Sequence, residues 1–355
     1  MKRMIWTRTR ITMTWSQKTW TSDRLRSFRY ICVAWVGPPS WGIVPWRAFV
    51  FLCLDLQEYM CMSIIPIDEF ISIHQLRFHI RRWSPTRAEP TMPPIVLLHG
   101  LASATRIWDF VAPLLAEQGY EVVALDQRGH GESDKPDDGY DFATIVADDA
   151  AVFAGLGVLN PVLVGHSWGA MVALQYAATF PRQVRSLVLV DGATNQLSLR
   201  PGWSREQAMI DLAPPRFAGT PRETFLAFFK RGPLGQQWSP ALEDSILHIV
   251  QLRDDDTVAP RLSFEHHLQI IGAMWDQPTF SLYQQVRCPV KLVVAEQPDV
   301  PAERAEFMRQ RRMGIAEIQR INSRVQVVTL PDTIHDIPLQ RPERLAEEIK
   351  TTVGA

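Results

Sequence analysis

Short apolar runs rich in Val and Leu alternate with helical patterns along most of this chain after residue 76. The apolar runs cover residues 95–98, 121–125, 161–164, 184–190, 290–294 and 325–330. The helical patterns cover residues 107–118, 143–156, 168–179, 301–321 and 342–353. Apolar runs of this length are typical of strands buried on both faces, and parallel strands need a crossover helix between them. The sequence therefore predicts an α/β fold with a mostly parallel central sheet flanked by helices.

Residues 195–285 interrupt this alternation, because they supply helical stretches but no convincing strand. They contain ten aromatic residues: Trp203, Phe217, Phe225, Phe228, Phe229, Trp238, Phe264, Trp275, Phe280 and Tyr283. A structureless loop of this length inside a compact domain is improbable, so we interpret the segment as an inserted helical cap. The core of the fold is then expected at residues 63–194 and 286–355. Most of the aromatic residues are expected to pack within the cap, and a few that face the sheet would form an apolar pocket.

The first 62 residues differ in composition from the rest. They carry six of the 12 Trp residues, and Lys and Arg outnumber Asp and Glu in them. Pro and Gly interrupt their apolar stretches, so no span of about 20 apolar residues exists and we expect no membrane span. We interpret residues 1–62 as a disordered or non-native extension, with Met60 or Met62 as the natural start. A basic aromatic arm that touches a membrane or a partner is the alternative.

Charge and cysteine content exclude several classes of protein. The formal net charge is −1, so the chain as a whole offers no field that would recruit nucleic acid. Of the four cysteines, only Cys288 lies beyond residue 62, and we expect it to be a small buried hydrophobic residue. The cysteines thus provide no disulfide framework, which fits a reducing, cytoplasmic location. The sequence does not predict an oligomeric state.

A Gly-x-Ser-x-Gly motif at residues 165–169 stands where an apolar run ends and a helical pattern begins. A side chain on so sharp a turn can be reactive only if its neighbours leave room, and Gly165 and Gly169 carry no Cβ. Ser167 is therefore the candidate nucleophile. It needs a base to accept its proton and an acid to orient that base.

His335 is the leading candidate for the base, because it follows the last apolar run and precedes the last helical pattern. Reactive groups in parallel sheets gather at the carboxyl ends of the strands. His99 ends another apolar run, and we expect its imidazole to hold the local loop. The backbone amides of Leu101 and Trp168 would then bind the oxyanion that forms during acyl transfer.

The segments HGLAS (99–103), DQRGHGESDKP (126–136), GHSWGA (165–170), LVLVDGA (187–193) and HDIPLQRPE (335–343) follow one another in the order found in one known family. The chain resembles the α/β-hydrolase fold family of the serine-nucleophile type. This resemblance implies that the acid follows the strand before the last one. Asp299 is the expected residue, although it lies one residue further along than the common spacing. Asp191 and Glu296 remain alternatives.

The other polar clusters suggest no additional site. The turn containing Asp126, Arg128 and His130 lacks the pattern of a phosphate loop, and we expect it to be structural. Asp148 and Asp149, like the acidic run 254–256, are expected to be solvated. His266 and His267 are expected at the surface of the cap or packed within it. No cluster has the spacing of metal ligands, so we expect neither a metal nor a cofactor.

These residues predict cofactor-independent hydrolysis through an acyl-enzyme, with a small apolar ester or lactone as the substrate. Resemblance to the family leaves carbon–carbon bond hydrolysis, aminopeptidase and perhydrolase activity open. It also leaves open a ligand receptor without catalysis. Dehalogenases and epoxide hydrolases of this fold carry aspartate at the elbow, so Ser167 argues against those two activities.

Overall fold

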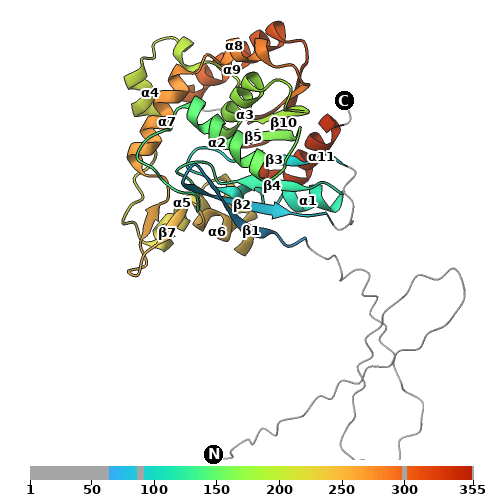
Figure 1. Cartoon of the computed structure of the whole chain (residues 1–355). Helices are drawn as coiled ribbons and strands as arrows, with labels where there is room; N and C mark the ends of the chain where they lie inside the picture. Colours follow the sequence, from blue (N-terminus) through green and yellow to red (C-terminus); the bar gives the residue numbers. More distant parts are fainter. Residues whose placement is uncertain (1–63, 86–91, 298–301, 354–355) are drawn as a thin grey trace, which may run out of the picture. The chain divides into compact units, whose positions relative to one another are not determined.

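The computed structural model describes residues 64–85, 92–297 and 302–353. An eight-stranded sheet with the order β1-β2-β4-β3-β5-β6-β9-β10 forms its centre (Figure 1). Its strands are β1 (Ile67–Ile73), β2 (Leu76–Trp83), β3 (Ile95–Leu98), β4 (Val122–Leu125), β5 (Val162–His166), β6 (Ser186–Val190), β9 (Val290–Glu296) and β10 (Val325–Pro331). Six of these strands pair in parallel with one another, as predicted from the six apolar runs: β4, β3, β5, β6, β9 and β10.

An antiparallel hairpin of β1 and β2 extends one edge of the sheet, and β2 pairs antiparallel with β4. His74 and Gln75 form its tip with φ of 49° and 69°, the left-handed conformation that two-residue hairpin turns require. Sequence analysis missed both strands of this hairpin. The residues of β1 are all exposed or half-buried, so this edge strand lacks the continuous apolar run of the central strands.

Helices cover both faces of the sheet (Figure 1). On one face α2 (Phe142–Gly155), α3 (Trp168–Thr179), α8 (Thr279–Gln285) and α9 (Ala302–Ile321) contribute to one apolar core. On the other face α1 (Ala112–Glu117) and α11 (Pro342–Val353) contribute to a second. The predicted α/β architecture is therefore confirmed. The helical pattern at 107–118 is in fact a 3-10 turn, η1 (Thr105–Trp108), followed by the short α1.

β6 and β9 are neighbours in the sheet, and the chain between them is mainly helical, as predicted. We call residues 195–285 the inserted segment. It contains η2 (Leu197–Leu199), α4 (Arg205–Asp211), α5 (Arg222–Arg231), η3 (Pro233–Gln237), α6 (Pro240–Leu247), β7 (Val250–Leu252), β8 (Val258–Pro260), α7 (Phe264–Asp276) and α8. We expected no strand in this segment. That expectation was wrong, because β7 and β8 form a small antiparallel hairpin. Strands of three residues are too short to leave a periodic signal in sequence.

The chain divides into two units, Met1–Met62 and Ser63–Ala355. The predictions made for residues 1–62 lie outside the described residues.

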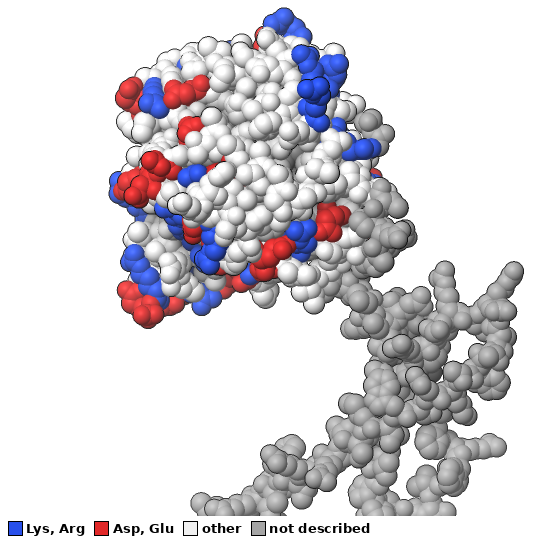
Figure 2. Space-filling view, in the orientation of Figure 1, with Lys and Arg blue, Asp and Glu red and all other residues white. Residues whose placement is uncertain are grey.

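On the face of the second unit drawn in Figure 2, acidic and basic side chains lie beside one another along the left and lower margins, and a group of basic side chains lies at the upper right. Within the described ranges, no helix is long and apolar enough to cross a bilayer.

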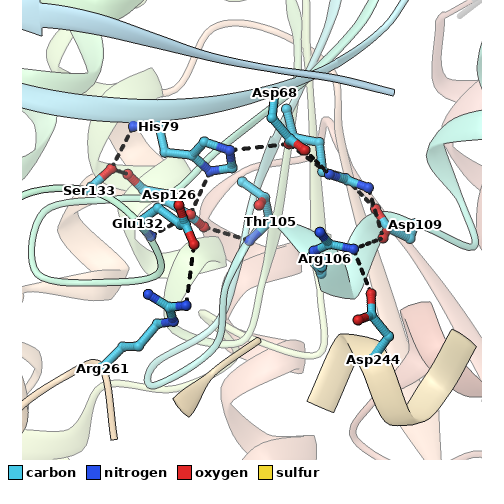
Figure 3. Close-up of polar contacts among 11 residues, drawn as sticks. Asp68, His79, Thr105, Arg106, Asp109, Asp126, Glu132, Ser133, Asp244 and Arg261 are labelled. Carbon is cyan, nitrogen blue, oxygen red and sulfur yellow. Dashed lines mark hydrogen bonds and ion pairs between the residues drawn. The ribbon is translucent and has the colours of Figure 1, made fainter. Parts of the chain in front are cut away.

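The turn after β4 is built around the buried carboxylate of Asp126, as its structural interpretation predicted. Asp126 accepts hydrogen bonds from His79 Nδ1 at 2.7 Å and from the backbone amides of Thr105 at 2.7 Å and Glu132 at 2.9 Å (Figure 3). A Cβ at Gly131 would lie 2.0 Å from this carboxylate. Burial works against the charged form, but these hydrogen bonds and the nearby imidazoles lower the pKa of Asp126 overall.

Ion pairs also join this region to the inserted segment (Figure 3). Arg106 of η1 contacts Asp244 of α6 at 2.6 Å, and Arg261, after β8, contacts Glu132 at 3.2 Å. These contacts are at least partly exposed, so we expect each to stabilise the segment by less than about 1 kcal/mol.

The prediction that Asp148 and Asp149 are solvated was wrong, because both are buried on the inner face of α2. Arg128 Nε contacts Asp148 at 2.7 Å, which compensates that charge. Burial and the charge of Asp148 raise the pKa of Asp149 well above its ordinary value. Burial therefore favours the neutral form of Asp149. A pair of adjacent acids on a helix gives no sign in the sequence that the chain will bury it.

Candidate active site

Ser167 lies on a sharp turn between β5 and α3, in the left-handed region with φ of 56°. This conformation is uncommon for a residue with a side chain. Its neighbours have to be glycine because the chain segments approach closely here. A Cβ at Gly165 would lie 2.2 Å from the carbonyl oxygen of Gly169, and one at Gly169 would lie 2.4 Å from that of His99. The motif is thus a tight elbow that projects the serine from the carboxyl edge of the sheet.

His335 lies beside the serine although 168 positions separate them in the sequence. It follows β10 and precedes α10 (Ile337–Gln340). Ser167 Oγ and His335 Nε2 are 2.9 Å apart, which is hydrogen-bond distance for transfer of the hydroxyl proton to the imidazole. These two residues are the pair that sequence analysis selected.

On its other side, His335 Nδ1 donates a hydrogen bond to Asp191 Oδ2 at 2.7 Å. Asp191 follows β6, and its side chain is 5% exposed. Of the two candidate acids that the structure describes, Asp191 is therefore the one that contacts the histidine. Glu296 ends β9 with an exposed side chain. Asp299 lies outside the described residues, so its predicted role is untested.

The conformation of Asp191 is fixed by its surroundings. Its φ is 49°, and the backbone amide of Ala295, in β9, donates to its Oδ1 at 2.7 Å. Arg311 Nη2, from α9, donates to the same oxygen. The next residue, Gly192, packs so closely on the elbow that a Cβ there would lie 2.0 Å from the Ser167 carbonyl oxygen. The end of β6 and the elbow therefore form one rigid unit.

The charges of the site favour an ionised acid and a basic histidine. Burial opposes ionisation of Asp191, but its hydrogen bond with His335 and the charge of Arg311 lower its pKa overall. Partial desolvation of the His335 ring likewise opposes its protonation, yet the hydrogen bond and charge of Asp191 raise its pKa above the ordinary value. An ionised carboxylate in this place can stabilise an imidazolium at His335.

His166, within the motif, supports the loop that carries His335. Its Nε2 donates to the backbone carbonyl of His335 at 2.9 Å, and the residue is 2% exposed. Burial and the neighbouring His335 lower the pKa of His166 to about 4. The imidazole is therefore neutral near pH 7 and adds no positive charge beside the base.

The two residues expected to bind the oxyanion each stand next in the chain to a residue of the elbow or one close to it. Trp168 is the first residue of α3, and the first amides of a helix have no partner inside it. Leu101 follows Gly100, where a Cβ would lie 3.2 Å from Ser167 Cβ. His99 orders this loop as predicted: its Nδ1 donates to the Gly100 carbonyl at 2.8 Å, and its Nε2 accepts from the amide of Gln127 at 3.1 Å.

A cavity of about 840 Å³ opens over the serine, lined by the elbow, the histidine loop and the inserted segment. The inserted segment contributes the side chains Phe228, Phe229, Leu234 and Met274. Two of the ten aromatic residues noted in the sequence thus line the cavity. Phe217 and Phe225 pack against them within the segment. In the residues that the structure describes, no group of three or more His, Cys, Asp or Glu side chains is placed to hold a metal ion.

Comparison with known proteins agrees with this fold. Residues 93–239 match the family model of the alpha/beta hydrolase fold. A solved structure of E-2-(acetamidomethylene)succinate hydrolase aligns with 82% of this chain and 100% of its own, with a TM-score of 0.64 and 24% identity. The chain has the α/β-hydrolase fold, and residues 93–239 resemble that family in sequence.

Curated relatives of this hydrolase-fold chain match over shorter stretches. The 2-(acetamidomethylene)succinate hydrolase of Mesorhizobium japonicum is 36% identical over 128 residues, which are 36% of this chain and 45% of that protein. Epoxide hydrolase A of Mycobacterium tuberculosis is 40% identical over 109 residues, which are 30% of this chain and 33% of that protein. The matched stretches thus span less than half the length of these relatives.

Two residues of this hydrolase-fold site were not singled out from the sequence. Arg311 is one of several arginines in the helical pattern at 301–321, and nothing in that pattern separates it from the others. His166 could have been considered, because it precedes the candidate nucleophile directly. Its contact is with the backbone of a residue 169 positions away, which no local pattern reveals.

Proposed function

We propose that this protein is a cofactor-independent serine hydrolase that cleaves carboxylic esters or lactones through an acyl-enzyme. The observation that carries the proposal is the continuous hydrogen-bonded chain from Ser167 Oγ to His335 and on to Asp191, at 2.9 Å and 2.7 Å. An arrangement of serine, imidazole and buried carboxylate is what a weak hydroxyl nucleophile needs for activation.

In the proposed reaction, Ser167 Oγ attacks the substrate carbonyl carbon while His335 Nε2 takes the hydroxyl proton. The amides of Leu101 and Trp168 bind the oxyanion of the tetrahedral intermediate. When the intermediate collapses, His335 returns the proton to the leaving alcohol and the acyl-enzyme remains. Water then attacks the acyl carbon, giving up a proton to His335, and the released Ser167 regains it. Asp191 orients the imidazole and stays ionised throughout.

The lining of the cavity supports an apolar substrate. Phe228, Phe229 and Leu234 face it from the inserted segment, and Met171 faces it from α3. Apolar walls with a few converging polar groups are the usual design of a small-molecule pocket. A volume of about 840 Å³ accommodates an acyl chain or ring well beyond acetate.

The proposal is tested with a fluorophosphonate probe and with p-nitrophenyl esters of increasing chain length. We expect the wild-type chain to be labelled and to turn over esters, and Ser167→Ala to do neither. Ser103→Ala, in the loop after His99, is the matched control and should keep its labelling. Absence of labelling and turnover in the wild type, together with stabilisation by an added apolar ligand, would instead indicate a non-catalytic binding protein.

A further inference from the structure

Arg311 lies in α9, yet its guanidinium is buried at the edge of the sheet that carries the candidate site. The residue is 6% exposed. Its Nη1 donates to the carbonyl oxygen of Ala295 at 3.2 Å, and its Nη2 donates to Asp191 Oδ1. The amide of Ala295 donates to that same Oδ1 at 2.7 Å. The three residues therefore close a ring of hydrogen bonds between the ends of β6 and β9 and the helix.

This ring determines which oxygen of Asp191 faces the histidine. With two donors on Oδ1, the carboxylate cannot rotate without breaking both hydrogen bonds, so Oδ2 stays directed at His335 Nδ1. An arginine suits this task because its planar fork offers two donors in fixed directions, here to a carbonyl and a carboxylate. A lysine ammonium could supply the charge but not the same pair of directed bonds.

We propose that Arg311 is a positioning residue for the Ser167–His335–Asp191 site, which fixes the carboxylate of Asp191 in its contact with His335. The inference rests on the proposed function, because it assigns Arg311 a role in the same hydrolytic site. It goes beyond that function because Arg311, a residue of α9 that does not itself react, would set the position and charge of the groups around His335.

The charged groups around His335 give the direction of the effect. Asp191, at the end of β6, and Asp336, on the histidine's own loop, favour the imidazolium. Arg311, from α9, disfavours it, and His166, at the end of β5, is neutral near pH 7. Loss of the Arg311 charge therefore removes the positive charge that acts against the two carboxylates and raises the pKa of His335.

The size of the shift follows from distance and solvent access. Arg311 and His335 both contact the carboxylate of Asp191, so their charges are separated by little more than its width. The His335 side chain is 51% exposed, which weakens the interaction between them. We expect a shift of about one pH unit.

The test compares Arg311→Met, Arg311→Gln and Arg311→Lys with the wild type in the pH dependence of kcat/KM on a p-nitrophenyl ester. Arg309→Met is the control, because Arg309 belongs to the same helix but has a 57% exposed side chain paired with Glu306. The Met and Gln variants should show the acidic limb about one unit higher and kcat/KM at its plateau reduced about tenfold. The Lys variant should keep its acidic limb within about 0.3 unit of the wild type. The control should match the wild type throughout.

A second readout needs no turnover. The imidazole of His335 can be titrated by NMR in the Ser167→Ala background with and without Arg311→Gln, and the pKa should rise in the doubly substituted chain. An unchanged or lowered pKa there, with an unchanged acidic limb, overturns the role of Arg311. If the wild type neither turns over esters nor reacts with the fluorophosphonate, the proposed function fails, while the NMR titration still decides the inference.

Discussion

Replacement of Asp191 by asparagine is predicted to reverse the hydrogen-bond roles around His335. The two groups that donate to Oδ1, Arg311 and the Ala295 amide, require an acceptor there. The asparagine oxygen must occupy that position, which turns its NH₂ toward His335 Nδ1. Because an NH₂ group donates, Nδ1 must then be the unprotonated nitrogen, and the proton moves to Nε2. In that tautomer His335 cannot accept the proton of Ser167.

The expected loss in kcat for Asp191→Asn is about 10⁴-fold, or about 5 kcal/mol of transition-state stabilisation. Asp299→Asn, made in parallel, should change kcat less than about threefold if Asp191 is the acid. Both variants are assayed on the same p-nitrophenyl ester near pH 8. Thermal unfolding of each confirms that the loss is not one of folding.

The reasoning is refuted if Asp191→Asn keeps more than about one tenth of the wild-type kcat. It is refuted equally if Asp299→Asn loses two orders of magnitude or more. The second result would mean that the acid expected from family spacing orients the histidine and that the contact with Asp191 is a resting arrangement.

Three further predictions concern the elbow, the base and the turn after β4. Gly192→Ala should lower kcat/KM at least about 100-fold, because the new Cβ would lie 2.0 Å from the Ser167 carbonyl oxygen and must displace the elbow; the rate of fluorophosphonate labelling checks this. In the wild type, kcat/KM should fall with decreasing pH through an apparent pKa above the ordinary value for histidine, because protonated His335 cannot accept a proton; a profile that stays flat below pH 6 contradicts it. Asp126→Asn should lower the free energy of unfolding by about 1.5–3 kcal/mol in urea titrations, because it removes the charged partner of His79 Nδ1 inside the core, while Asp68 still contacts the other ring nitrogen. The lowered pKa of Asp126 also means that its contribution, complete above about pH 4, is lost as the pH falls further.

Most of the sheet was predictable because its central strands are buried on both faces, a requirement that leaves continuous apolar runs in the sequence. Ser167 and His335 were predictable for a related reason: each stands where a recognisable strand pattern stops. β1 and the β7–β8 hairpin lacked such a signal, since one is an exposed edge strand and the other is very short. Asp148 and Asp149 were misjudged because burial of a charged helix face depends on a partner such as Arg128, which a tertiary contact supplies.

Sequence analysis offered the contact between Asp191 and His335 only as an alternative, and the sheet shows why the ends of β6 and β9 were hard to tell apart. β6 and β9 are adjacent and parallel, with Val190 opposite Val293, so Asp191 and Ala295 end up at the same edge. Adjacent strands are about 4.8 Å apart, roughly the reach of one aspartate side chain. At Asp191 the left-handed backbone directs the carboxylate across this gap, where the Ala295 amide and Arg311 hold it. In the arrangement we propose, β6 supplies the acid, while β9 contributes backbone hydrogen bonds that keep it in place. A sequence pattern records which residues follow each strand, but not which of two adjacent strands provides the charge and which provides its support.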